Sequence, residues 1–193
     1  MKRLLSLLLI GCSAVFAQAG FTKLFDGKSL SGWTPEGNAK WTVSRGALLS
    51  DQSGDGWLRT NKMYTDFIFK VEFRNSPKGN SGVFFRATQK SKPGEPNPLD
   101  GYELQIHNED EKWATGSIED VIQRLVLVNP TPNQWHSYEL QAHGDHFVAK
   151  LDGTKVLDGR DSKLKSGFIG LQHHKNMKVE FRNIQIEELG AKR

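Results

Sequence analysis

Apolar and polar residues alternate with a period of two along most of this chain, most clearly in segment 66–74. One side of that segment is apolar and the other is charged: Phe67, Phe69, Val71 and Phe73 against Lys70, Glu72 and Arg74. Such alternation is typical of a β-strand with one buried and one solvated face. Helical periodicity is nearly absent. The pattern therefore predicts an all-β chain.

Other segments rich in aromatic and β-branched residues predict further strands, in 41–51, 80–88, 101–108, 136–159, 166–174 and 177–189. Tight turns are predicted within these segments at Arg45-Gly46, His143-Gly144-Asp145 and Asp152-Gly153. In the last segment the alternation slips by one residue at Arg182-Asn183, which predicts a β-bulge. Short strands at this spacing indicate an antiparallel sandwich or barrel.

No repeat and no linker divides the chain, so we expect one domain over about residues 20–190. Two segments are predicted loops: 89–101, which contains three prolines, and the acidic segment 108–120. They flank the strand at 101–108, so we expect them near its two ends. Loops that border a polar strand face are frequent places for functional sites.

The first 19 residues have the parts of a secretory signal. Lys2 and Arg3 precede an apolar stretch, and small residues lead to cleavage after Ala17 or Ala19. The sequence "LIGC" also fits a lipoprotein signal, which would leave Cys12 as a lipidated N-terminus. Ordinary cleavage is favoured, because no polar tether follows Cys12. Both alternatives predict an exported protein, periplasmic or extracellular, with a lipid anchor only in the second.

Charge and composition exclude several classes of protein. The formal net charge of +4 falls to +2 when Lys2 and Arg3 are removed, which does not indicate a nucleic-acid partner. No second apolar run approaches the ~20 residues that span a membrane. Cys12 is the only cysteine, so the mature chain would lack disulfides and depend on its hydrophobic core. A chain of this length can bury about 70% of its unfolded surface. The sequence leaves the oligomeric state open.

The strand at 101–108 carries the first candidate chemistry. Its alternation places Glu103, Gln105 and His107 on one side, opposite an apolar side. Antiparallel sheets often have one solvated face, which would account for these three residues without a function. The floor of a binding site would also account for them, although on these three residues alone the solvated face is favoured.

Two other strands add polar residues of the same kind. Arg86 is expected on the same face as Phe84, and Gln172 shares a face with His174. Arginine, glutamate, glutamine and histidine with few lysines suit the binding of sugar hydroxyls, which need fixed donors and acceptors. Of the five tryptophans, Trp113 lies in the acidic loop, where it can stack on a sugar ring or anchor the loop.

Several kinds of catalytic site find little support. Ordinary glycoside hydrolysis needs two carboxylates, and Glu103 is the only one on the candidate face. Loop carboxylates could lean in, but none is marked by its spacing: Asp100, Glu109, Asp110, Glu111 and Glu119. No spacing typical of a metal site, a phosphate-binding loop or a dinucleotide fingerprint is present. We therefore predict neither a metal nor a cofactor. A metal held across the sheet by His107 and His174 is the alternative that the sequence leaves open, although no spacing marks it.

Nine motifs occur in order along the chain: "GFTKLFDGKSLSGW", "YTDFIFKVEFR", "NSGVFFRA", "GYELQIHN", "TGSI", "QWHSYEL", "LDG", "GFIGLQHH" and "VEFRNIQI". Together they resemble the 3-keto-disaccharide hydrolase family over essentially the whole mature chain. The resemblance implies a jelly-roll β-sandwich of the concanavalin A-like lectin/glucanase type, with the sugar lying across a concave sheet.

The resemblance also implies a chemistry in which one base is enough. A ketone at carbon 3 of a glycoside acidifies the proton at carbon 2. A base removes that proton, the group at carbon 1 leaves by β-elimination, and addition of water completes a net hydrolysis. Such a route needs the base, a group that stabilises the enolate, and a proton donor for the leaving oxygen.

The family motifs imply roles for individual residues. Glu103 and Gln105 match its "GYExQ" strand, Arg86 matches "SGxxxRA", and Gln172 and His174 match "GLQxH". We expect Glu103 or His107 to be the base and His174 to be the acid or a binding group. The remaining residues are expected to contact substrate, with the first two holding the ketone: Arg86, Gln105, Gln172, Trp113 and Glu119.

One residue departs from the family pattern, which usually has an aromatic residue where this chain has Glu119. If Glu119 points inward, it supplies a second carboxylate. Three functions follow from the sequence. The favoured one is a hydrolase or lyase that cleaves 3-keto-glycosides. The alternatives are a glycan-binding domain without activity and a conventional glucanase that uses Glu103 with a loop carboxylate.

Overall fold

The structure is a computed structural model that describes residues 20–89 and 99–190. The predicted leader, with Cys12, Ala17 and Ala19, lies outside the described residues. So does most of the predicted proline-rich loop at 89–101.

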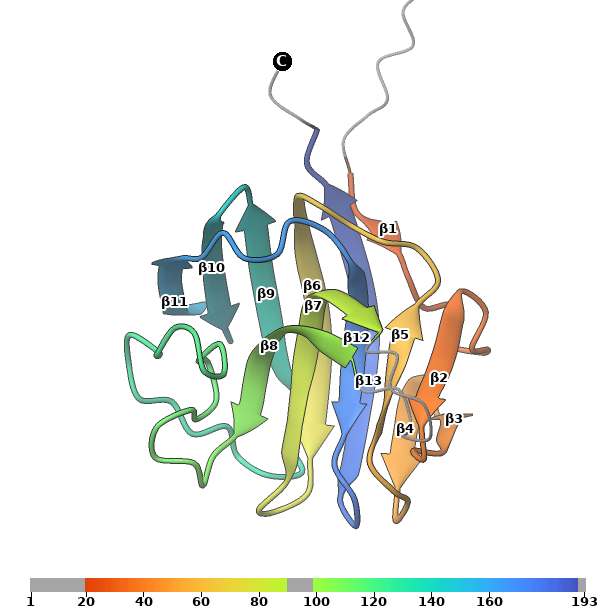
Figure 1. Cartoon of the computed structure of the whole chain (residues 1–193). Coiled ribbons are helices and arrows are strands. Elements are labelled where there is room, and N and C mark those ends of the chain that lie inside the picture. Colours follow the sequence, from red (N-terminus) through yellow and green to blue (C-terminus); the bar gives the residue numbers. More distant parts are fainter. Residues whose placement is uncertain (1–19, 90–98, 191–193) are drawn as a thin grey trace, which may run out of the picture.

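Two antiparallel sheets packed face to face make up the described part of the chain (Figure 1). The larger sheet has the order β11-β10-β9-β6-β13-β4-β3, with β1 paired to β13. Its strands are β1 (Thr22–Lys23), β3 (Trp41–Ser44), β4 (Ala47–Asp51), β6 (Phe67–Asn75), β9 (His136–His143), β10 (His146–Leu151), β11 (Thr154–Arg160) and β13 (Lys178–Glu188).

The smaller sheet has five strands in the order β2-β5-β12-β7-β8. These are β2 (Trp33–Gly37), β5 (Gly56–Thr60), β7 (Asn80–Gln89), β8 (Leu99–His107) and β12 (Phe168–His173). No helix occurs in residues 20–89 or 99–190. The prediction of an all-β, antiparallel β-sandwich is therefore confirmed.

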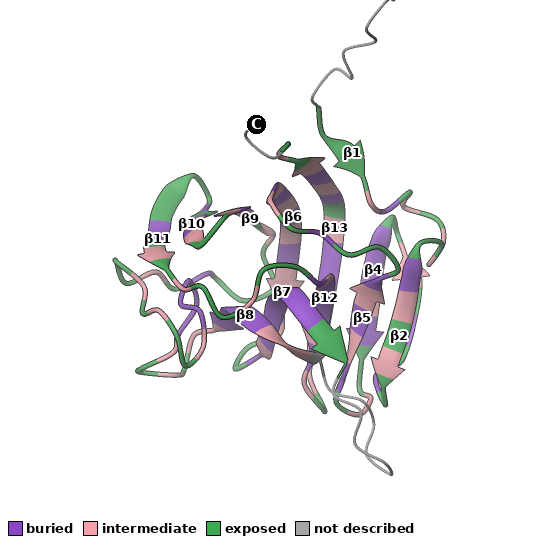
Figure 2. Cartoon of the chain, turned by 45° about the horizontal axis from the view of Figure 1, so that its top comes forward, coloured by how far each residue is buried: buried purple, intermediate pink, exposed green. Residues whose placement is uncertain are grey.

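The two sheets differ in how their outer faces meet solvent. Strand β6 alternates strictly between buried and half-exposed residues, so the larger sheet has one core face and one wet face (Figure 2). In β7 every residue from 81 to 87 is buried, and in β8 every residue from 102 to 106 is buried. The outer face of the smaller sheet is thus shielded over these two strands. A solvated face does not account for the polar residues of β8.

The tight turns and the predicted bulge are confirmed. Arg45 and Gly46 connect β3 to β4 with φ of 52° and 76°, and Asp152 and Gly153 connect β10 to β11 with φ of 48° and 81°. Both pairs have the positive φ that a two-residue type I′ hairpin requires. In β13 the register shifts between Arg182 and Gln185.

Sequence reasoning missed three strands: β1, β2 and β5. Strand β2 contains Pro35, which argues against a central strand, but β2 lies at the edge of its sheet. Proline is tolerated there because an edge strand has one side without sheet partners. Strand β5, "GWLRT", is short and begins with glycine, so its alternation covers too few residues to stand out.

Candidate functional site

The outer face of the smaller sheet brings the predicted polar residues together. The register pairs Glu103 with Phe84, Gln105 with Gly82 and His107 with Asn80 across β8 and β7. Because paired residues of neighbouring strands point to the same face, β7 places an aromatic ring, a glycine and an amide beside the three residues of β8.

Strands β12 and β5 extend the same face. Phe84 pairs with Gly170, which in turn pairs with Arg59, and Gln172 pairs with Trp57. The Trp57 ring meets the Phe84 ring edge to face at 6.0 Å, and the Arg59 guanidinium lies 4.3 Å from the centre of the Phe168 ring. The outer face of the smaller sheet therefore combines aromatic rings with carboxyl, amide and imidazole groups.

Buried polar atoms without a partner gather on this face. Within the described part of the chain, seven buried side-chain nitrogen or oxygen atoms have no hydrogen-bond partner. One is Trp41 Nε1, in the core, and the other six lie on the outer face of the smaller sheet: Trp57 Nε1, Asn80 Oδ1, Glu103 Oε1, Gln105 Oε1, Gln172 Oε1 and His174 Nδ1. Unpaired buried polar groups cost about 1–3 kcal/mol each. Such a cost concentrated on one face indicates a ligand-binding surface.

The carboxyl group of Glu103 lies directly over Gly82. A Cβ atom at Gly82 would come within 2.2 Å of Glu103 Oε1, so only glycine leaves room for the side chain. Glu103 is 6% exposed and Gln105 is 3% exposed. Because Gly82 pairs with Gln105, the buried carboxyl lies over the neighbouring strand and two residues closer to His107 along β8 than the Glu103 backbone.

The acidic segment predicted as a loop folds back along the free edge of β8. The backbone N–H of Glu119 donates to the Glu103 carbonyl at 3.0 Å, and the N–H of Gln105 donates to the Ser117 carbonyl at 2.9 Å. Thr115 N–H donates to the His107 carbonyl at 3.0 Å. This pairing makes Glu119 the lateral neighbour of Glu103, on the side away from β7.

The surroundings of Glu103 change its acidity. Burial raises the pKa of Glu103 well above its usual range, and the charge of Glu119 and a hydrogen bond with the Glu119 side chain raise it further. A carboxyl with a raised pKa is a stronger base when ionised and an available proton donor when protonated.

His107 and Trp113 lie at the rim of the face. His107 is half-buried, and its positive charge when protonated helps to lower the pKa of Asp110, after the larger effect of the Trp113 N–H bond to that carboxylate. Asp110 Oδ1 accepts the backbone N–H groups of Lys112 and Trp113 at 2.8 and 2.6 Å. The half-buried Trp113 thus belongs to an ordered turn beside β8.

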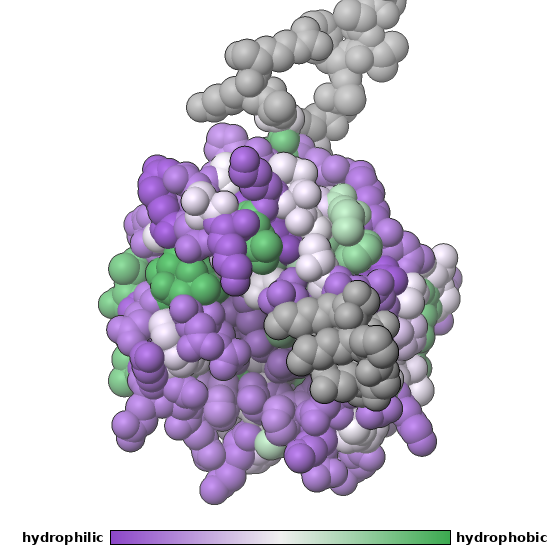
Figure 3. Space-filling view, viewed as in Figure 1, coloured by the Kyte–Doolittle hydropathy of each residue, from purple (hydrophilic) through white to green (hydrophobic). Residues whose placement is uncertain are grey.

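The connection between β8 and β9 also carries apolar surface. Val121, Leu125, Val126 and Leu127 are exposed, the last at 70%. Figure 3 shows hydrophobic surface on the left of a mostly hydrophilic face, the side on which this connection lies in Figure 1.

The two adjacent histidines at the end of β12 have different surroundings. His173 is fully buried, and its two ring nitrogens lie 3.0 Å from the carbonyl oxygens of Gly54 and Met177. His174 faces outward, with its Nδ1 3.7 Å from Asp55 Oδ1, too far for a hydrogen bond. His174 therefore joins the polar face, while His173 fixes two turns below it.

The expectation that Arg86 shares a face with Phe84 is wrong. Arg86 has a φ of 50° at a bulge where β7 shifts register against both β8 and β12. Its side chain enters the sandwich, 1% exposed, with the guanidinium 5.2 Å from the centre of the Phe147 ring. Ala87 packs instead with Phe84 and Trp57.

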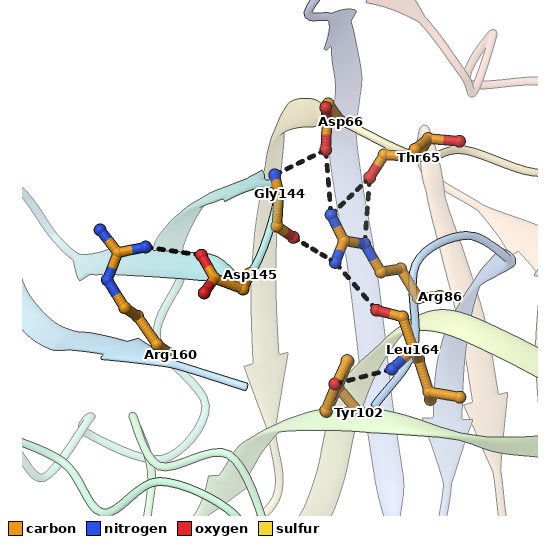
Figure 4. Close-up of polar contacts among 8 residues, drawn as sticks. All are labelled: Thr65, Asp66, Arg86, Tyr102, Gly144, Asp145, Arg160 and Leu164. Carbon is orange, nitrogen blue, oxygen red and sulfur yellow. Dashed lines mark hydrogen bonds and ion pairs between the residues drawn. The ribbon is translucent and has the colours of Figure 1, made fainter. Parts of the chain in front are cut away.

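The Arg86 guanidinium is saturated by neighbouring groups (Figure 4). It donates to the carbonyl oxygens of Thr65 at 2.8 and 3.0 Å, Gly144 at 2.6 Å and Leu164 at 2.9 Å, and to Asp66 Oδ1 at 3.1 Å. These bonds use all five N–H donors of the side chain. Arg86 joins three connecting segments at one end of the sandwich and has no donor left for a ketone.

Trp57 was missed as a site residue. The segment that contains it, β5, was not predicted as a strand, so no face could be assigned to its side chain. Its unpartnered indole N–H is a hydrogen-bond donor on the polar face. The alternation of "GWLRT", with Trp57 and Arg59 on one side, is the signal that could have revealed it.

No group of three or more histidine, cysteine, aspartate or glutamate side chains is placed to hold a metal ion within residues 20–89 and 99–190. Across those same ranges, no helix has the length and apolarity needed to cross a membrane.

Residues 20–187 match the model of the 3-keto-alpha-glucoside-1,2-lyase-like domain family. The chain belongs to this family. A curated relative, the 3-keto-disaccharide hydrolase of Bacteroides thetaiotaomicron, is 26% identical over an alignment 230 positions long, which covers 88% of this chain and 79% of the relative. The resemblance seen in the nine motifs is thereby confirmed, and both names are those of carbohydrate-acting enzymes.

Two of the solved structures that are similar to this member of the 3-keto-alpha-glucoside-1,2-lyase-like family share its fold over most of their length. A Parabacteroides distasonis protein named as a candidate glycosyl hydrolase has a TM-score of 0.77 and 23% identity, covering 89% of this chain and 94% of that one. The carbohydrate-binding module CBM66 of Bacillus subtilis has a TM-score of 0.65 and 20% identity, covering 83% and 98%. At these identities the similarity establishes the shared fold.

Proposed function

We propose that this chain cleaves 3-keto-glycosides, including 3-keto-disaccharides, by base-assisted elimination followed by hydration on the outer face of the smaller sheet. The observation that carries the proposal is the buried carboxyl of Glu103, held over Gly82 among unpartnered amide and indole groups. The signal sequence predicted at residues 1–19 would place this activity outside the cytoplasm.

Glu103 is the base of the proposed reaction. Its burial makes the ionised carboxylate a strong base, which the removal of a proton from carbon requires. The indole N–H of Trp57 and the amides of Gln105 and Gln172 lie in the next row of the face, where they can donate to the oxygen of the ketone and stabilise the enolate.

The two histidines serve the rest of the substrate. The backbones of Glu103 and His107 lie four residues, about 13 Å, apart along β8, so we assign the two side chains to different parts of the substrate. His107, with Asn80 beside it, and His174 line the far end of the same face, where they bind the second sugar or other leaving group.

The first prediction concerns the substrate. The mature chain is expected to release the leaving group from 3-keto-glycosides and to leave the unoxidised parent glycosides intact, because only the ketone acidifies the proton at carbon 2. Chromatography of the products formed from the 3-keto-glycosides and from their unoxidised parents checks this. Cleavage of the parents would instead indicate a conventional glucanase.

A glycan-binding domain without activity is the second candidate, favoured by the structural similarity to a carbohydrate-binding module. Calorimetric titration of the same 3-keto-glycosides separates it from the enzyme. Binding without release of any product would support the binding domain and overturn the proposed reaction.

A second prediction tests the position of the base. Gly82→Ala is expected to lower kcat by about 10- to 100-fold, because its methyl group displaces the Glu103 carboxyl from above the strand. The control is the same change made in a Glu103→Gln chain, where little further loss of activity is expected. An additional loss of the same size there would show that Gly82 acts independently of Glu103.

A further inference from the structure

We propose that Glu103 and Glu119 act as one carboxyl pair that shares a single proton, with Glu103 taking the proton from carbon 2 and Glu119 delivering the shared proton to the leaving oxygen. This inference rests on the proposed function and assigns its acid. It makes Glu119 a catalytic residue, whereas the family motifs implied only a contact with substrate.

The backbone geometry brings the two side chains together. Glu119 is held beside Glu103 by its N–H bond to the Glu103 carbonyl at 3.0 Å, and Leu104 forms an isolated bridge with Ile118. Residues laterally opposite in an antiparallel pair have Cβ atoms about 4.5–5.5 Å apart. Side chains at this spacing can bring their carboxyl groups within hydrogen-bonding reach, and a bond between two carboxyl groups requires that one of them carry a proton.

The surroundings make a doubly ionised pair costly at neutral pH. Glu103 Oε1 is buried and has no donor within the described residues. The other described residues that face Glu103 are uncharged: Gly82 and Phe84 on β7, and Gly170 and Gln172 on β12. Because these described neighbours supply no cation, the pair relieves its repulsion by retaining one proton.

The shared proton balances the reaction. Glu103 takes the proton from carbon 2, and the electrons of that bond form the enolate and then the double bond between carbons 1 and 2. The bond from carbon 1 to the leaving oxygen breaks, and Glu119 supplies the proton to that oxygen. Water then adds its hydroxyl to carbon 1, its proton passes to the pair, and the pair returns one proton to carbon 2. The pair ends as it began.

The test is Glu119→Gln with two leaving groups. With a 3-keto-disaccharide, whose leaving sugar alcohol needs a proton, kcat is expected to fall by about 100-fold or more. With a 3-keto 4-nitrophenyl glycoside, whose leaving phenol is acidic, the fall should stay within about tenfold. Glu111→Gln, a change of the same charge at an exposed position in the same connection, serves as the control and should match the wild type.

The pH profile gives a second measurement. The wild type should lose activity on both sides of its optimum, as the pair gains a second proton or loses its only one. Glu119→Gln should lose the alkaline decline and keep the acidic one. Equal losses of kcat with both leaving groups in Glu119→Gln, or a pH profile unchanged from the wild type, would overturn the proposed carboxyl pair. An inactive wild type would overturn the proposed function instead.

Discussion

Replacing Glu103 by glutamine is expected to lower the turnover of 3-keto-glycosides by about 100- to 10,000-fold and to make the folded chain more stable at neutral pH. The loss of turnover follows from the loss of the base. The gain in stability follows because the variant no longer places an ionised carboxylate in a buried site beside Glu119.

The sign of the pH dependence follows from the direction of the pKa shift. The pKa of Glu103 is raised in the folded chain, so the folded state binds more protons than the unfolded state. The contribution of Glu103 to the free energy of unfolding is then fully present below the unfolded pKa of about 4.3, and it is lost as the pH rises through the folded pKa. The wild type and Glu103→Gln should have the same free energy of unfolding at about pH 4. Above the folded pKa, the free energy of unfolding of the variant should be higher by about 1.4 kcal/mol for each unit by which the pKa of Glu103 is raised.

Urea unfolding at several pH values checks the stability, and Glu139→Gln is its control. The Lys150 and Lys70 side chains bond to Glu139 and lower its pKa, although burial opposes them. That carboxylate therefore adds stability above the unfolded pKa, and its removal should destabilise the chain as the pH rises. A Glu103→Gln chain that keeps turnover within tenfold of wild type would show that Glu103 is not the base.

How far the site can be predicted depends on whether alternation can be followed through each strand. In β8 apolar and polar residues alternate without interruption, so the shared face of Glu103, Gln105 and His107 follows from the sequence. In β13 apolar residues on both sides of Arg182-Asn183 reveal the slip. In β7 the run Val83, Phe84 and Phe85 is apolar on both faces, so no alternation marks the bulge that turns Arg86 inward.

The position of Glu119 could not be predicted for a different reason. The segment that carries it is polar, has small residues and lacks strand periodicity, so the sequence indicates a loop. Its register against β8 is set by backbone hydrogen bonds between Glu119 and Glu103 and between Gln105 and Ser117. Asn108 fastens the segment by accepting from Thr115 Oγ1 at 2.7 Å and donating to the Pro130 carbonyl at 2.7 Å. Such contacts join residues whose spacing carries no pattern.

Arg86 shows that a family motif can be a requirement of folding. Its five donated hydrogen bonds join the carbonyl groups of Thr65, Gly144 and Leu164 and the carboxylate of Asp66. The Asp66 carboxylate also accepts the Gly144 N–H at 2.8 Å. Without the guanidinium, three carbonyl oxygens and a carboxylate lose their shared partner at the end of the core.

Arg86→Met is therefore expected to destabilise the chain by about 3–5 kcal/mol, because buried groups are left without a partner. Urea unfolding measures this, with Arg160→Met as the matched control. Arg160 pairs with Asp145 in the same region (Figure 4). These two side chains are 64% and 48% exposed. Because exposed ion pairs add little stability, the control should stay close to the wild type.

Arg86→Lys separates the structural role from the substrate contact implied by the family motif. Lysine keeps the charge and reaches part of the carbonyl cluster, but it lacks the planar fork, so we expect a smaller loss of stability. If Arg86 only holds the three connecting segments, the folded Arg86→Lys chain should keep the wild-type KM for a 3-keto-glycoside. A large increase in KM at unchanged stability would show that Arg86 contacts the substrate. That result would contradict the structure, in which its side chain points inward from the bulge of β7.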